Sequence, residues 1–238
     1  MIEFRDVTLR YHYDEYSLFE NLSFTLPDGV NTVLCDVQSG KSSLCKMILG
    51  LLPPTCGNVL LDGVDLYNGD KGAKPQLSAL YLPSQPTFFP NKTVLYNLQY
   101  PLRVRKQLAA SEEKVALLAE KYNLTDGLAV KVKKLDFRQK KLLSLARGQT
   151  LQRDIVLFDS FFDDTEQDDE LLSENSVLDS FNCRTKLIFT ANPNHARGNT
   201  VVIENKKCAY CGDSDGARDF VAGLTWLASL EAQSINQE

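Results

Sequence analysis

The chain has 238 residues, enough for one large α/β domain or for a domain with a smaller insert. Its 43% apolar and 24% charged residues exclude general disorder, and its net charge of −5 argues against nucleic acid as the main partner. No apolar run approaches the roughly 20 residues that span a bilayer, and the first residues do not resemble a secretory signal. We therefore expect a cytoplasmic protein that is peripheral to a membrane only through a partner.

The sequence contains six cysteines. In a cytoplasmic protein we expect them to be reduced and packed rather than bridged. Cys208 and Cys211 have the spacing of a redox pair or of half a zinc site, but no second cysteine pair or histidine cluster completes it. Packed thiols are therefore favoured over a metal site.

The pattern of the N-terminal third of the sequence predicts mainly strands. Residues 2–9 and 18–26 partly alternate apolar and polar side chains, which is typical of antiparallel strands with one buried face. A short buried strand over 30–34 follows, and a helical pattern begins near Leu44. Residues 58–66 then predict a hairpin that turns at Asp-Gly.

The rest of the chain alternates helices and strands. A helical insert is predicted over 91–134, with Ser111 as an N-cap, and a further helix over 135–152. Buried strands are predicted over 79–82, 155–159 and 187–190, with a helix over 171–181 between the last two. A hairpin over 201–210 and a terminal helix over 220–230 follow. This alternation of strands and helices is typical of a sheet with parallel strands. The acidic run over 163–174 predicts a solvated helix N-terminus.

Residues 35–43 read Cys-Asp-Val-Gln-Ser-Gly-Lys-Ser-Ser between a predicted strand and a predicted helix, the context of a phosphate-binding loop. In such loops backbone N–H groups surround the phosphates, the lysine pairs with β and γ oxygens, and the first serine ligates Mg²⁺. Gly40, Lys41 and Ser42 fit this chemistry, whereas Cys35 stands where the loop pattern has glycine. Taken alone, an accidental Gly-Lys-Ser tripeptide remains an alternative.

The order of these segments resembles the ATP-binding subunit of an ABC transporter over nearly the whole chain. The first strand leads to Tyr11, which is similar to the family's adenine-stacking aromatic, with Tyr13 close enough to compete. Residues 81–90 resemble the Q-loop, and residues 155–159 the Walker B strand. With these segments in the family's order, the accidental tripeptide is no longer the favoured explanation.

The resemblance implies an α/β fold of the P-loop ABC-type ATPase class, with a mixed sheet core, an antiparallel β subdomain and an inserted helical subdomain. It divides the chain into a core, residues 1–90 and 135–238, and a helical subdomain, residues 91–134. It also implies ATP and Mg²⁺ as cofactors. The implied nucleotide-binding residues are Tyr11, Ser39, Gly40, Lys41, Ser42 and Ser43, and the implied metal ligands are Ser42 and Asp159.

Several positions depart from the family's hydrolytic residues. Ser160 stands where the family has its general-base Glu, and a hydroxyl is too weakly basic to activate water at neutral pH. Ser84 aligns with the Q-loop Gln, although Gln85 is one residue away. Ala191 occupies the position of the switch His, and the nearest imidazole, His195, is expected to be a surface loop residue.

The signature segment departs too. The family has L-S-G-G-Q where this chain has Leu135, Asp136, Phe137, Arg138 and Gln139. In the family the signature Ser and Gly contact ATP that is bound by the opposite subunit. An aspartate in place of that Ser would bring a carboxylate near a phosphate, and a phenylalanine would block close backbone approach. The D-loop over 163–166 is altered as well.

Two hypotheses follow. In the first, the chain is an ATP-binding subunit that pairs with a second ATP-binding protomer and a membrane permease, with weak or absent hydrolysis. In the second, it is a non-catalytic pseudo-ATPase that acts as a nucleotide-binding scaffold or regulatory subunit. An unrelated P-loop kinase fits poorly, because the hairpin and signature segments would then be coincidences.

Overall fold

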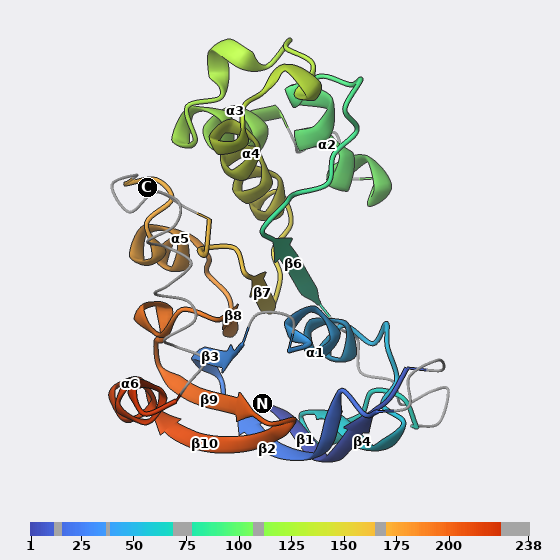
Figure 1. Cartoon of the computed structure of the whole chain (residues 1–238). Helices are drawn as coiled ribbons and strands as arrows, with labels where there is room; N and C mark the ends of the chain where they lie inside the picture. The colour runs from blue at the N-terminus through green and yellow to red at the C-terminus, as the bar shows by residue number, and fades with distance from the viewer. Residues whose placement is uncertain (12–15, 37–38, 69–77, 107–111, 165–169, 225–238) are drawn as a thin grey trace.

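The computed structural model describes residues 1–11, 16–36, 39–68, 78–106, 112–164 and 170–224. Within them the strands form two sheets (Figure 1). The smaller sheet has the order β2-β1-β4-β5, and its strand pairs are antiparallel, as the alternating pattern predicts. Its strands are β1 (Ile2–Leu9), β2 (Phe19–Leu26), β4 (Cys56–Leu61) and β5 (Val64–Asp65).

The larger sheet has the order β10-β9-β3-β8-β7-β6. All neighbours are parallel except β9 and β10, which form an antiparallel hairpin, so the predicted mixed sheet is confirmed. Strand β7 is buried at every residue because elements cover both faces of the sheet. The strands are β3 (Gly29–Cys35), β6 (Ala79–Pro83), β7 (Ile155–Asp159), β8 (Thr185–Thr190), β9 (Asn199–Glu204) and β10 (Lys207–Asp213).

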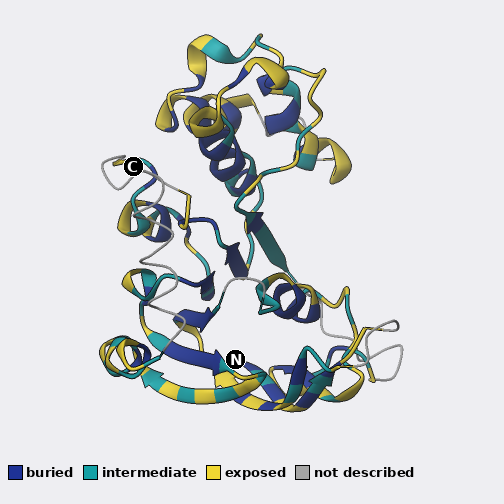
Figure 2. Ribbon diagram, viewed as in Figure 1, coloured by how far each residue is buried: buried dark blue, intermediate teal, exposed yellow. Residues whose placement is uncertain are grey.

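Helix α1 (Lys41–Ile48) lies between the two sheets (Figure 1). Its apolar face, which includes Leu44 and Met47, belongs to the core that both sheets share. Figure 2 marks the buried residues of α1 and of the strands around it in dark blue. Helices α5 (Glu174–Ser180) and α6 (Ser214–Ala222) pack elsewhere on the larger sheet. The position of α1 fixes the first residues of the helix at the carboxyl end of β3.

Helices α2 (Val94–Val104), α3 (Glu112–Lys121) and α4 (Phe137–Gln149) gather at one end of the molecule, at the top of Figure 1. Helix α4 runs from this group down to β6. A Cβ atom on Gly148 would lie 2.7 Å from Leu80 Cδ2, so glycine lets the helix approach the strand. Single 3₁₀ turns occupy Thr125–Gly127, Val132–Lys134 and Pro193–His195.

Element boundaries differ from the predictions by a few residues, and the difference has a clear cause at two helices. The predicted helix over 135–152 is shorter, because Asp136 caps its start and it ends at Gln149. The terminal helix begins at Ser214 rather than near residue 220, because Asp213 accepts hydrogen bonds from its first turn. The predicted cap Ser111 and the end of the predicted terminal helix lie outside the described residues. Nowhere in the described ranges is a helix both long and apolar enough to cross a membrane.

Candidate functional site

The loop after β3 enters α1 at Gly40. This residue is in the left-handed region with φ 95°, and a Cβ atom on it would lie 2.6 Å from Phe19 Cζ and 2.7 Å from Leu18 Cδ2. Glycine is therefore required by both conformation and space. Among the described residues no side chain caps the helix at this end, so its first backbone N–H groups are suited to an anionic ligand.

The lysine of this loop folds back onto the loop itself. The Lys41 ammonium donates to the carbonyl oxygens of Asp36, at 3.0 Å, and Cys35, at 3.4 Å. Ser39 also bonds to Asp36, through its hydroxyl and its backbone N–H. Cys35 is the fully buried last residue of β3 and pairs with Ile203, so the position without glycine has ordinary strand geometry. The lysine thus lies beside the loop in which a phosphate would bind.

Two hydroxyl groups meet one carboxylate oxygen next to this loop. Ser42 Oγ and the Tyr81 hydroxyl each donate to Asp159 Oδ2 at 2.6 Å. Asp159 ends β7 and is only 5% exposed, and Tyr81 comes from the neighbouring strand β6. Burial, together with this hydrogen bond, raises the pKa of Tyr81 well above its usual range. Sequence reasoning placed Ser42 and Asp159 together but missed Tyr81, because only strand pairing brings it here.

These residues line a hollow of about 490 Å³. One wall is the start of α1 over residues 40–43, and the other is formed by the carboxyl ends of β6 and β7 with Ser84, Gln85 and Ser160. An ammonium, a hydroxyl and a buried carboxylate around one hollow suit a phosphate group with a divalent cation.

Tyr11 approaches the site from the end of β1. Its side chain is 40% exposed, and its hydroxyl lies 2.9 Å from Ser43 Oγ in the first turn of α1. An exposed aromatic ring beside the loop is available for stacking on a planar group. The competing residue Tyr13 lies outside the described residues.

The profile of the protein family described as "ABC transporter" matches residues 19–162. The chain belongs to this family as an ATP-binding domain. A molybdate/tungstate import ATP-binding protein of Methanocaldococcus jannaschii is 32% identical over 142 residues, which are 59% of this chain and 46% of that protein. A putative ABC transporter ATP-binding protein of Deinococcus radiodurans is 30% identical over 67% of this chain and 70% of its own. A thiamine import ATP-binding protein of Shigella flexneri is 26% identical over 90% and 93%.

The chain thus spans about half the length of the molybdate/tungstate relative. Among solved structures, a bacterial Atm1-family ABC exporter with ATP bound superimposes with a TM-score of 0.76. The match has 19% identity and covers 98% of this chain and 41% of that one. The fold is therefore that of a P-loop ABC ATPase, as the resemblance implied.

Two positions of this ABC ATP-binding domain at which the resemblance predicts a departure from the family line the hollow. Ser160, in place of the general base, has a left-handed backbone with φ 50°, and its N–H donates to the Phe189 carbonyl at 2.8 Å. The Ser84 N–H donates to the Asp159 carbonyl at 2.9 Å, and Gln85 follows it on the same wall. The position of the Q-loop Gln therefore stays open between the two.

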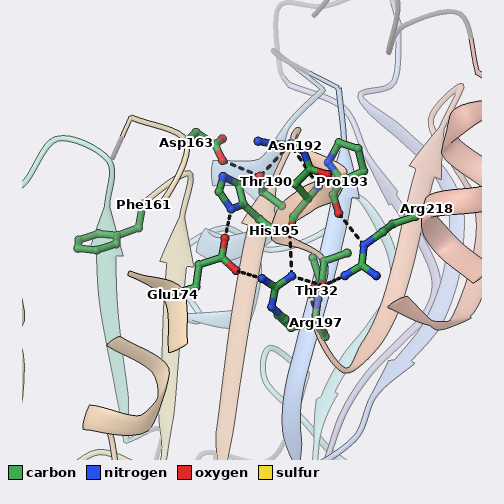
Figure 3. A network of polar contacts seen from close by, with 12 residues as sticks. Thr32, Phe161, Asp163, Glu174, Thr190, Asn192, Pro193, His195, Arg197 and Arg218 are labelled. Carbon is green, nitrogen blue, oxygen red and sulfur yellow. Dashed lines mark hydrogen bonds and ion pairs between the residues drawn. The ribbon is translucent and has the colours of Figure 1, made fainter. Parts of the chain in front are cut away.

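His195 is not the surface residue that we expected from the sequence. Its side chain is only 15% exposed and its Nδ1 atom contacts Glu174 Oε1 (Figure 3). Arg197 forms an ion pair with the other oxygen of Glu174 at 2.8 Å. Burial lowers the pKa of His195. The prediction of a solvated acidic run is also wrong at Glu174, because this carboxylate is 12% exposed and paired.

The signature segment has a local role that the family comparison alone does not suggest. Asp136 Oδ1 accepts from the Gln139 N–H at 2.7 Å, and Gln139 Oε1 accepts from the Asp136 N–H at 3.1 Å. This reciprocal pair is a capping box for α4, and its Asp-x-x-Gln spacing is visible in the sequence. The carboxylate in place of the signature Ser is thus engaged within its own helix. Phe137, in place of a glycine, is 44% exposed.

Proposed function

We propose that this chain is the ATP-binding subunit of an ABC-type transporter, which binds MgATP at an interface with a second ATP-binding protomer and hydrolyses it weakly or not at all. The observation that carries the proposal is the meeting of Ser42, Tyr81 and Asp159 beside Lys41 in one hollow. Family membership favours ATP as the ligand, and the hollow has space for its phosphates and a cation.

Each implied site residue has a role in this proposal. Lys41 leaves the loop carbonyls and pairs with the β and γ phosphates, because a phosphate is a stronger acceptor for an ammonium than a carbonyl is. Ser42 and Asp159 hold Mg²⁺ through a hydroxyl and a carboxylate, the oxygen ligands that this cation takes. Ser39, Gly40 and Ser43 contribute the loop and the first helical turn, and the Tyr11 ring stacks on adenine.

We expect weak hydrolysis because of the residues at the base position and in the signature segment. The acid that follows Asp159 in the family is Ser160 here, and its φ of 50° is an unfavourable conformation for a non-glycine residue. Asp136 and Phe137 in the signature segment would offer a partner's ATP a carboxylate and an exposed ring. Both this site and the site to which this chain would contribute a signature are therefore expected to turn over slowly.

The proposed assembly has a core of residues 1–90 and 135–238 and a helical subdomain of residues 91–134. Helices α2 and α3 of the latter stand apart from the sheets, which supports a helical subdomain, and α4 of the core segment lies beside them. A membrane permease would hold the subunit at the cytoplasmic face of a membrane. Relatives are named for molybdate/tungstate import, thiamine import and putrescine export, so their names favour no single cargo or direction. No role for nucleic acid is proposed, given the net charge of −5.

The alternative is a pseudo-ATPase in which nucleotide binding serves a scaffold or regulatory role. The combined absence of a base at Ser160 and of a switch His at Ala191 favours this reading over that of a fully active motor. The two readings differ in whether binding is coupled to movement of a membrane partner.

Calorimetry with MgATP tests the proposal. We expect one saturable site, abolished by Lys41→Ala and retained by Lys46→Ala, which removes an exposed lysine from the last turn of the same helix. Steady-state ATPase activity of the purified chain should stay at background. Absence of MgATP binding at high nucleotide concentration would overturn nucleotide binding altogether, whereas robust turnover that disappears in Lys41→Ala would overturn weak hydrolysis.

A further inference from the structure

A second hollow lies at the opposite ends of the same strands. It has a volume of about 400 Å³ and is lined by the amino ends of β6 and β7, by α3, and by the carboxyl ends of α4 and α5. Asp159 and the phosphate loop lie at the carboxyl ends of β6 and β7, so the two hollows are separate. Its volume is within the range of small-molecule sites.

One wall of this hollow is fixed by hydrogen bonds. Gln149 Nε2 donates to the Tyr122 hydroxyl at 2.6 Å and to Ser180 Oγ at 2.7 Å, and Lys121 donates to Gln149 Oε1 at 3.2 Å. These bonds join the end of α3 to α4 and α5. A wall whose polar groups are already paired does not need to rearrange before a ligand enters, so the hollow is preformed.

The lining is part apolar and part polar, and the hollow is partly open. Leu118, Val156 and Phe181 are buried side chains that form its floor, and Leu80 is half-buried. At the rim, Leu117 is 59% exposed, although it lies on the face of α3 that borders the hollow. A ligand that covered this apolar surface would gain about 25 cal/mol of favourable free energy for each Å² removed from water.

The rim also carries positive charge, which no acid in the described part of the chain neutralises by contact. Arg153 and Lys114 line the hollow, and within the described ranges neither forms an ion pair or a side-chain hydrogen bond. Arg105 is near enough to repel Arg153, and this repulsion adds to burial in lowering the pKa of Arg153. Asp154 acts in the opposite direction and raises the pKa of Arg153, but by less than burial and Arg105 lower it. An anion at the rim would relieve the repulsion between these cations.

We propose that this hollow binds a small organic carboxylate with an apolar body. The carboxylate would pair with the Arg153 guanidinium, whose planar fork matches two carboxylate oxygens, with Lys114 as a second cation. The hydrocarbon would lie against Leu117, Leu118 and Phe181. Because the hollow is distant along β6 and β7 from the nucleotide site, this binding is independent of the proposed ATP site.

Octanoate is a suitable probe because it joins a carboxylate to a hydrocarbon chain. Acetate keeps the carboxylate without the long chain, and octan-1-ol keeps the chain without the charge. By calorimetry with the full chain we expect saturable octanoate binding at one site, with acetate and octan-1-ol at least tenfold weaker. Arg153→Gln should weaken octanoate binding about tenfold, since loss of a charge-assisted bond of this kind removes about 1.4 kcal/mol. Arg5→Gln, at an exposed arginine of the smaller sheet, is the matched control and should change nothing.

A second pair of variants, at Leu117, tests the proposal even if the substitution of Arg153 prevents folding. Leu117→Asp should abolish octanoate binding by placing a like charge at the rim, whereas Leu117→Asn should retain part of it. Leu51→Asp places the same charge at a 72% exposed leucine elsewhere and should have no effect. No octanoate binding at millimolar concentration, equal binding of octan-1-ol, or binding that is unchanged in both Arg153→Gln and Leu117→Asp would overturn the proposal.

Discussion

The Tyr81 hydroxyl donates a 2.6 Å hydrogen bond to Asp159 Oδ2, the same oxygen that accepts from Ser42. The two bonds hold the carboxylate in one orientation beside the phosphate loop. Tyr81→Phe should therefore weaken ATP binding in the presence of Mg²⁺ about fivefold, the effect of one lost hydrogen bond of about 1 kcal/mol. ATP affinity in EDTA should not change. Calorimetry with and without Mg²⁺ measures both.

Tyr67→Phe is the control for the loss of a tyrosine hydroxyl, because Tyr67 donates to the Met47 carbonyl at 2.7 Å, away from the hollow. It should leave both affinities as they are. An equal loss of affinity with and without Mg²⁺ in Tyr81→Phe would show instead that the phenol contacts the nucleotide directly.

Ser160→Glu restores the family's base but should leave ATPase activity at background. The new side chain would stand on a backbone with φ 50°, and the signature residues Asp136 and Phe137 would remain unsuited to a partner's ATP. A phosphate-release assay measures the turnover, with Ser160→Gln as the isosteric control. Turnover well above that of the control would show that the base alone was missing.

Asp136 should contribute to stability as a helix cap. Asp136→Ala removes the acceptor for the Gln139 N–H and should lower the free energy of unfolding by about 1 kcal/mol. Asp136→Asn and Asp136→Ser keep a capping oxygen and should lie close to the wild type. Urea unfolding distinguishes them, and equal destabilisation by Ala and Asn would mean that the charge, rather than the cap, matters.

Lys141 is fully buried, and its ammonium donates to the Phe161 carbonyl between the rings of Phe137 and Phe161. Burial lowers the pKa of Lys141 to about 8. Below pH 8 the folded chain therefore carries a disfavoured buried charge, so Lys141→Met should raise the free energy of unfolding at pH 7 by about 1 to 2 kcal/mol.

The sign of the pH dependence follows from proton binding. Between pH 8 and about 10 the unfolded chain retains a proton that the folded wild type has lost, so the wild type becomes more stable as pH rises. The advantage of Lys141→Met should shrink over this window. Urea unfolding at several pH values checks it, with Lys140→Met as the neighbouring control. An advantage that does not change with pH would assign the effect to packing.

The sequence alone determined the strand and helix order and the phosphate loop, because these depend on local patterns. Alternation of apolar side chains predicted β1 and β2, and Gly-Lys-Ser between a strand and a helix predicted the loop around Gly40. The resemblance also predicted departures from the family, such as Ser160 in place of the base. Even the Asp136 to Gln139 cap was present as a spacing, although only the structure drew attention to it.

The tertiary structure decided which side chains meet across long sequence separations. Parallel pairing of β6 with β7 brings Tyr81 to Asp159, and the packing of α5 against the turn after β8 buries His195 against Glu174. It also places Arg153 at the rim of the second hollow with no ion-pair partner among the described residues. These contacts depend on strand register and helix packing, which join segments far apart in the chain, so no local pattern encodes them.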